Sequence, residues 1–279
     1  MTSTDTLPAP SPGARVRPLA GAVAAEWVRF RSVRSTWWGL AAALVLMVLV
    51  SAMGAINTAS AMERGSLPAA DLPASEMAVY GSVWAVQFAL VGVALTFAAS
   101  EYAHGSVQAS LQAVPVRWRW FTAKAVVVAA VTFSSSLVIA AVGTLTAHLV
   151  LSHPLLGGHG TLVLSRAAAD ALRCAVFLTL LSLTGLGTGT ALRSAAASLT
   201  TVSLLVLGLP VMTLFSANAL VAAVSVRLPL TAAIAFLGSD HVIGPLEGAL
   251  TPSGGLVVLM VWAATALAAG VLVLRYRDA

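Results

Sequence analysis

Six long apolar runs constrain this sequence more than any other feature. They cover, approximately, residues 38–58, 77–100, 125–151, 167–191, 195–216 and 254–274. A run of about 20 apolar residues is long enough to form a helix that crosses the hydrocarbon core of a bilayer. The chain is also 59% hydrophobic and only 9% charged, so it lacks the charge that a water-facing surface requires. We therefore expect an all-α, polytopic membrane protein of six transmembrane helices without a soluble globular domain.

The basic residues lie at the edges of the apolar runs and predict how the chain is oriented. One side of the expected membrane receives most of them: Arg15, Arg17, Arg29, Arg31, Arg34, Arg117, Arg119, Lys124, Arg193, Arg275 and Arg277. The other side receives few: Arg64, Arg166, Arg173 and Arg227. Because cytoplasmic segments carry the excess of Lys and Arg, we expect both termini in the cytoplasm of a multi-pass plasma (cytoplasmic) membrane protein. Bases distributed in this way do not indicate nucleic-acid binding, despite the net charge of +5.

The chain before the first apolar run divides into a tail and a helix. Residues 1–20 are rich in Pro, Ser and Thr, which predicts a disordered cytoplasmic tail. Residues 21–37 predict an amphipathic helix in the cytoplasmic interface, because four apolar residues lie near one face: Val23, Trp27, Phe30 and Val33. Arg34 lies close to this face and would have to snorkel. The six-helix transmembrane domain then covers 38–275, and 276–279 form a short cytoplasmic tail.

The loop between the second and third runs contains a short amphipathic segment. Three of its apolar residues share one helical face, and two glutamines point elsewhere: Val107, Leu111 and Val114, against Gln108 and Gln112. Pro115 prevents the helix from continuing. Such a helix suits two uses, lying on lipid or fitting a groove on a cytosolic partner. Glu101, at the end of the second run, also has two interpretations: a role in coupling, or a simple stop that pairs with Lys124 or Arg117.

Two stretches of the sequence resemble a known family. The segment EYAHGSVQASLQAVPVRWRWFTAK contains a Glu, Gly-Ser, a Leu, a Pro, a basic cluster and a Lys: Glu101, Gly105, Ser106, Leu111, Pro115, Arg117, Arg119 and Lys124. The stretch EWVRFRSVRSTWWGL contributes a second set: Glu26, Arg31, Arg34, Ser35 and Trp38. With the six-run layout and the broken segment before the last run, these stretches are similar to those of type 2 ATP-binding-cassette (ABC-2 type) exporter permeases.

The resemblance implies a function and assigns roles to these residues. It implies the transmembrane subunit of an ATP-driven exporter, which forms the translocation pathway as a dimer with a second copy or a paralogue. A separate ABC ATPase subunit would dock on the short helix after the second span: Glu101, Gly105, Ser106, Val107, Leu111, Val114 and Pro115. Further residues would position this helix: Glu26, Arg31, Arg34, Arg117, Arg119 and Lys124.

The chain contains no ATP-binding loop of its own. Its only lysine, Lys124, follows Trp120-Phe121-Thr122-Ala123, which does not match the GxxxxGK[ST] pattern that cradles phosphates. We therefore expect no enzymatic activity, no metal site and no cofactor on this chain, with ATP and Mg bound by the partner ATPase. Membrane lipid is the other expected partner.

Two other classes of function compete with transport. A membrane anchor or assembly factor that transports nothing is the alternative, and it would have no ATPase partner. An intramembrane enzyme or secondary transporter would need convergent ionisable groups at mid-membrane, and the apolar runs contain almost none. The substrate stays open, because a lipid, a peptide, a drug-like metabolite and a polyketide would all suit an apolar dimer seam.

Three further patterns are better explained by packing than by chemistry. The Gly185-x-Gly187-x-Gly189 pattern lies in an apolar run and follows no strand, so it predicts close helix packing rather than a nucleotide loop. Residues 217–253 are interrupted by Pro and Gly, which predicts short helices that dip into the outer interface.

The third pattern is a set of charges in the fourth run. Asp170 has Arg166 four residues before it and Arg173 three residues after it. Residues at these spacings are neighbours on a helix surface, so we expect ion pairs on one face near the outer interface.

Overall fold

The structure is a bundle of long apolar helices. The computed structural model describes residues 19–65, 72–103, 117–154, 158, 160–213, 218–239 and 250–277. Six of its helical segments are long and apolar enough to cross a membrane: Arg34–Glu63, Ser75–Ala98, Trp118–Leu151, Leu164–Leu192, Ala195–Met212 and Pro252–Tyr276. These segments match the six predicted runs, and the chain is a multi-pass membrane protein.

Most of these segments are single helices, and two are interrupted by a π-helical turn. The uninterrupted ones are α2 (Arg34–Glu63), α6 (Arg117–Leu151), α7 (Leu164–Leu192) and α12 (Pro252–Arg277). The second span consists of α3 (Ser75–Gly81), η1 (Ser82–Val86) and α4 (Gln87–Ala103). The fifth consists of α8 (Ala195–Ser203), η3 (Leu204–Gly208) and α9 (Leu209–Thr213).

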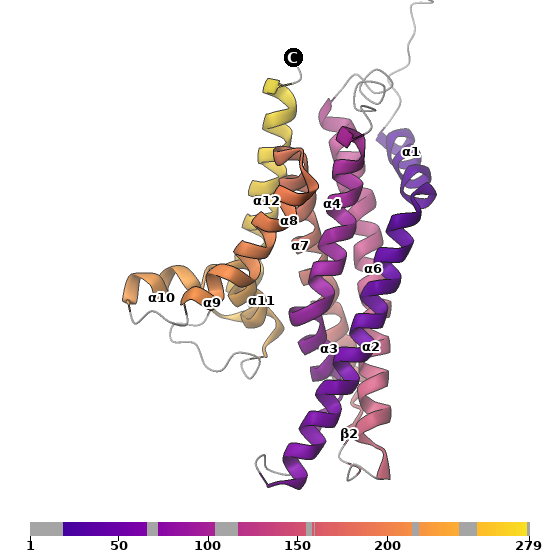
Figure 1. Ribbon diagram of the computed structural model, residues 1–279, viewed down its shortest axis with the longest axis vertical. Coiled ribbons are helices and arrows are strands. Elements are labelled where there is room, and N and C mark those ends of the chain that lie inside the picture. Colours follow the sequence, from indigo (N-terminus) through magenta and orange to yellow (C-terminus); the bar gives the residue numbers. More distant parts are fainter. Residues whose placement is uncertain are drawn as a thin grey trace, which may run out of the picture.

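The two ends of the bundle differ in what they carry (Figure 1). At one end, α1 (Leu19–Ser32) lies beside the start of α6, and α12 also ends there. We call this the terminal end. At the opposite end, β1 (Leu72–Pro73) pairs in parallel with β2 (Gly160–Thr161), with Leu72 opposite Gly160. We call this the strand end.

The helix α1 is shorter than the sequence predicted. It ends at Ser32, and residues 34–37 belong to α2, because Val33 has an extended backbone (φ −84°, ψ 109°) that separates the two helices. The indole N–H of Trp37 donates a hydrogen bond to the carbonyl of Arg31 at 3.1 Å across this break. The change of direction therefore lies inside the segment that was expected to be one interfacial helix.

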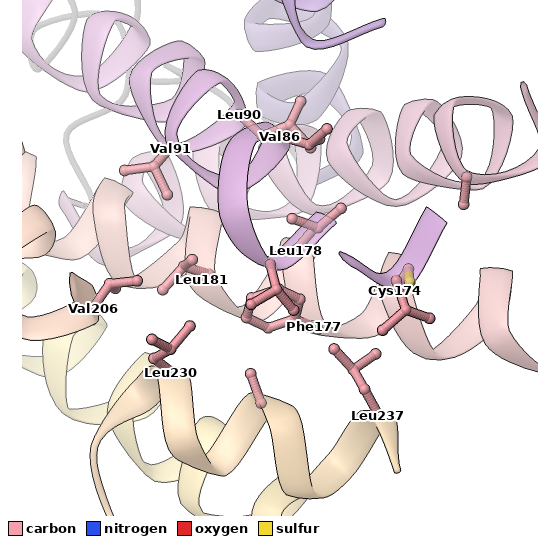
Figure 2. Close-up of a cluster of buried hydrophobic side chains, with 14 of the residues drawn as sticks. Val86, Leu90, Val91, Cys174, Phe177, Leu178, Leu181, Val206, Leu230 and Leu237 are labelled. Carbon is pink, nitrogen blue, oxygen red and sulfur yellow. The ribbon is translucent and has the colours of Figure 1, made fainter. Parts of the chain in front are cut away.

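The main hydrophobic core surrounds α7, which packs against α4, α6 and α12. In Figure 2, Phe177 of α7 lies among side chains of the second span, such as Leu90, and of α11 (Pro229–Leu237), such as Leu230. All three side chains are buried.

The glycines of α7 permit close approach to its neighbours, as predicted. A Cβ atom at Gly187 would lie 2.3 Å from the backbone carbon of Ala266 in α12, and one at Gly189 would lie 3.0 Å from the Cβ of Ala98 in α4. At Gly185 the nearest atom would be Cγ1 of Val91, at 3.1 Å. A side chain at Gly187 would thus force α7 and α12 apart, since the obstacle is backbone.

In the broken segment before the last span, the described residues 218–239 contain the two short helices α10 (Ala219–Ser225) and α11. Pro229 begins α11 and Gly238 ends it with a φ of 68°, a backbone conformation that glycine adopts without strain. The sequence predicted helices at the outer interface, but α11 is packed into the bundle, with every residue buried except Phe236. Its nine residues are too few to cross a bilayer.

Candidate functional site

The predicted docking residues fall mostly outside the described part of the chain. Gly105, Ser106, Val107, Leu111, Val114 and Pro115 lie within 104–116, which the structure does not describe. Glu101 belongs to the last turn of α4 and Arg117 begins α6, but their side chains are not described either. The structure does describe the two helices that flank this segment in the chain, α4 before it and α6 after it.

A buried lysine lies between these two helices. The side chain of Lys124, in the second turn of α6, is only 1% exposed, although lysine is almost never fully buried unless it is paired. Its Nζ donates a hydrogen bond to the carbonyl of Phe97 in α4 at 3.3 Å. Phe97 lies near the end of the second span, which runs from Ser75 to Ala98. The ammonium therefore ties the start of the third span to the end of the second.

Glu26 of α1 supplies the opposite charge. Its Oε2 lies 4.0 Å from Nζ of Lys124, and its side chain is 8% exposed. Glu26 occupies the buried stripe of α1 together with Ala22 and Phe30. Trp27, which the sequence placed on the apolar face, points away from the bundle and is 43% exposed. The side of α1 that faces the bundle thus carries its acid, and an aromatic residue faces outward.

Aromatic rings enclose the ion pair. The Nζ of Lys124 lies 4.4 Å from the ring centroid of Phe97 and 4.9 Å from that of Trp120, both within the range of cation–π attraction. The rings of Phe30 and Phe97 meet edge to face at 5.0 Å. The three helices α1, α4 and α6 are therefore joined by the ammonium of Lys124, the carboxylate of Glu26 and the aromatic side chains beside them. We call Glu26, Phe30, Phe97, Trp120 and Lys124 the lysine cluster.

Of the other predicted positioning residues whose side chains are described, none is part of the lysine cluster. Arg31 and Arg34 are exposed on either side of the break between α1 and α2. Arg119 is half-buried, and its guanidinium lies 5.5 Å from the ring centroid of its neighbour Trp118. The structure therefore brings together two of the predicted positioning residues, Glu26 and Lys124.

A second charged cluster lies at the strand end and confirms the expected pairing of Asp170. Its carboxylate is 3.9 Å from Nε of Arg166 and 3.7 Å from NH1 of Arg173. Two further contacts link α7 to α3: the Ser75 hydroxyl donates to Asp170 at 2.7 Å, and Arg166 donates to Glu76 at 2.6 Å. We call these five residues the aspartate cluster. Both arginines are about half exposed, so the cluster lies at the surface of the bundle.

Sequence reasoning named Glu26 and Lys124 as positioning residues but did not pair them, and it did not single out Phe97 or Trp120. It offered a pairing of Glu101 with Lys124 or Arg117, which lies outside the described side chains, and the structure places Glu26 beside Lys124. One signal for this was present: Ala22, Glu26 and Phe30 follow one another at four-residue spacing, which places all three on one helix face. An acid on a face with Phe30 needs a cation, but the chain has 14 arginines beside Lys124, so this spacing does not identify the partner.

Neither a metal nor a relative supplies an independent identification. Among the described residues, no group of three or more His, Cys, Asp or Glu side chains is arranged to hold a metal ion. The sequence matches no protein-family model and no curated protein.

Proposed function

We propose that this chain is the transmembrane subunit of an ATP-driven exporter of the ABC-2 type, in the plasma membrane with both termini in the cytoplasm. The lysine cluster is the observation that carries the proposal. Since α4 ends at Ala103 and α6 begins at Arg117, the predicted docking segment is attached at both ends to helices that Lys124 joins. A force on that segment would be transmitted to α4, α6 and α1 together.

The energetics of the lysine cluster favour this function over simple anchoring. Replacing a buried ion pair by well-packed apolar residues is often neutral or stabilising. A bundle that only anchors a partner therefore gains little from burying Lys124 and Glu26. A bundle that must move helices as a unit gains a fixed register among them, because an alternative packing would leave a buried charge without its partner.

In the proposed mechanism, a separate ATPase binds ATP and Mg and docks on the face formed by Val107, Leu111 and Val114. Closure of two ATPases would press on the docking segments of two permease chains. The lysine cluster would pass this displacement to the spans, which would tilt between two packed arrangements. The cargo would cross between the two chains.

The test is co-purification in mild detergent from membranes of the native host, followed by an ATPase assay of the eluate. The decisive variant is Leu111→Asp, which places a charge on the docking face. Its matched control is Gln112→Asp, which introduces the same charge one residue away on another face. We expect vanadate-sensitive ATPase activity to co-purify with the native chain and with Gln112→Asp, and to be lost with Leu111→Asp.

Two results would contradict the proposal. If no ATPase co-purifies with the native chain, the membrane anchor or assembly factor becomes the better account. If both aspartate variants lose the ATPase equally, the apolar face is not what docks, and the segment acts through its overall charge.

A further inference from the structure

A groove on the side of the bundle lies far from the lysine cluster. It has a volume of about 490 Å³ and is bounded by α2 on one side and by α3 and η1 on the other. This volume lies within the range of about 300–1,000 Å³ that is typical of small-molecule sites. The α2 residues that line it run from Val50 to Thr58, which corresponds to a length of about 12 Å at 1.5 Å per residue.

The groove opens outward and is closed toward the interior of the bundle. On its inner side α2 and α3 touch, since the Ser51 hydroxyl donates to the carbonyl of Met77 at 3.5 Å, and a Cβ atom at Gly54 would lie 3.0 Å from Sδ of Met77. On its outer side, Met53 is 62% exposed and Tyr80 is 40% exposed. A ligand would therefore enter from the surrounding lipid, between the two spans.

The lining changes in polarity along the helix axis. Asn57 and Thr58 line the part nearest the strand end, whereas Val50, Trp84 and Ala85 line the part nearest the middle of the bundle. No charged residue is among the described residues that line the groove. A groove of this kind complements a molecule with an uncharged or zwitterionic polar head and an apolar tail, with its head toward the strand end.

From this arrangement we propose that the groove binds the head and upper tail of a neutral or zwitterionic amphiphile taken from the adjacent leaflet. A second copy of the chain fits the groove less well. Helix–helix contacts in membranes rely on small residues that let backbones approach. Of the small residues that line the groove, Gly54 is covered by Met77, and Thr58 and Ala85 are half-buried. Large side chains such as Met53 and Tyr80 line the opening instead. This inference does not depend on the proposed function, since an amphiphile can bind a membrane protein that transports nothing.

The experiment uses the full chain in phosphatidylcholine nanodiscs, with a lysophosphatidylcholine that carries a diazirine in its acyl chain as the probe. After illumination, trypsin separates the relevant helices, because cleavage after Arg34, Arg64 and Arg117 isolates the two walls of the groove. Peptides 35–64 and 65–117 report on these walls, and peptide 125–166 reports on α6. We expect the label on the first two peptides to exceed the label on the third at least five-fold, and unlabelled lysophosphatidylcholine to compete for it.

Two variants and a control test whether the groove is the site. Ala85→Phe fills the groove from a half-buried position, and Met53→Trp blocks its opening from an exposed one, so the second should fold even if the first does not. Val138→Phe introduces the same side chain as Ala85→Phe at a residue of α6 that is 60% exposed and does not line the groove. We expect labelling of 35–64 and 65–117 to fall at least five-fold in both groove variants and to stay unchanged in Val138→Phe.

The head-group preference is tested by competition. Lysophosphatidylcholine should compete at least five-fold better than anionic lysophosphatidylglycerol, because no charged residue is among the described residues that line the groove, and Asn57→Leu should weaken competition by both lipids. Equal labelling of all three peptides would overturn the proposal in favour of ordinary boundary lipid. Labelling that survives both groove variants would overturn the location, and a disulfide between two chains carrying Met53→Cys would show that a second copy covers the groove.

Discussion

The lysine cluster and the aspartate cluster both join helices through charge, but in different surroundings. At the terminal end, one ammonium and one carboxylate are almost fully buried among aromatic rings. At the strand end, two arginines that are half exposed share Asp170 and Glu76, and Ser75 adds a hydrogen bond. We therefore expect the loss of either buried partner to cost much stability, and the loss of one half-exposed arginine to cost little, because a second arginine stays beside the acid.

The largest effect should come from Lys124→Ala, which removes a buried cation from beside the buried carboxylate of Glu26. Removing one partner of a buried pair costs about 3–5 kcal/mol, so the melting temperature in detergent should fall well below that of the native chain. Arg119→Ala serves as the control, because it removes a half-buried base from the same helix. Equal melting temperatures for the two variants would show that the lysine cluster is energetically no different from the surface.

The second effect is a rescue. Because apolar residues can replace a buried ion pair at little cost, the double variant Glu26→Leu, Lys124→Met should recover most of the stability that each single variant loses. Because each single loss should be about 3–5 kcal/mol and the double loss small, the double-mutant cycle should give a coupling energy above about 3 kcal/mol, measured by thermal or denaturant unfolding. Losses that simply add would mean that the two side chains do not interact, despite their 4.0 Å separation.

A smaller loss is expected at the strand end for Asp170→Asn. The amide keeps an oxygen for the Ser75 hydroxyl but no longer neutralises Arg166 and Arg173, so the cost should be about 1–2 kcal/mol. Unfolding of this variant is compared with that of Glu76→Gln, which weakens the contact of Glu76 with Arg166 and leaves Asp170 unchanged. A loss as large as that of Lys124→Ala would remove the contrast between the two clusters.

The smallest effect should come from Arg173→Ala, because Arg166 still neutralises Asp170. Exposed pairs contribute about 0–1 kcal/mol, and salt screens them. The difference in melting temperature from the native chain should therefore shrink between about 0.05 M and 0.5 M NaCl, where the Debye length falls from roughly 14 Å to 4 Å. The effect of Lys124→Ala should hardly change over the same range, and salt sensitivity there would contradict its burial.

The features that the sequence predicted are those that depend on neighbouring residues. The six spans follow from apolar runs, the pairing of Asp170 with Arg166 and Arg173 follows from helical spacing, and the packing of Gly187 follows from the absence of a side chain. The residues that signal each of these features lie within one helix, so the local sequence is enough to predict the feature.

The features that sequence reasoning missed depend on how helices meet. The contact of Lys124 with Glu26 requires α1 to lie against α6, and no pattern in either helix specifies that arrangement. The burial of α11 depends in the same way on α12, where Gly255 has no side chain and the carbonyl of Ala232 comes so close that a Cβ atom would lie 2.4 Å away. The end of α1 at Ser32 was also missed, since no Gly or Pro marks the extended residue Val33.

The π-helical turn of the second span has a consequence for how α3 and α4 are rotated relative to each other. The turn Ser82–Val86 holds one residue more than an α-helical turn would, and the side-chain amide of Gln87 donates back to the carbonyl of Val83 within it. Each residue of an α-helix advances the chain by about 100° around its axis. The surplus residue therefore sets the rotational phase of α3 relative to α4, and with it the direction in which Tyr80 and Met77 point. Deleting any one residue of this turn would restore a continuous α-helix, whereas the same deletion within α4 would turn every side chain on one side of it to a different neighbour.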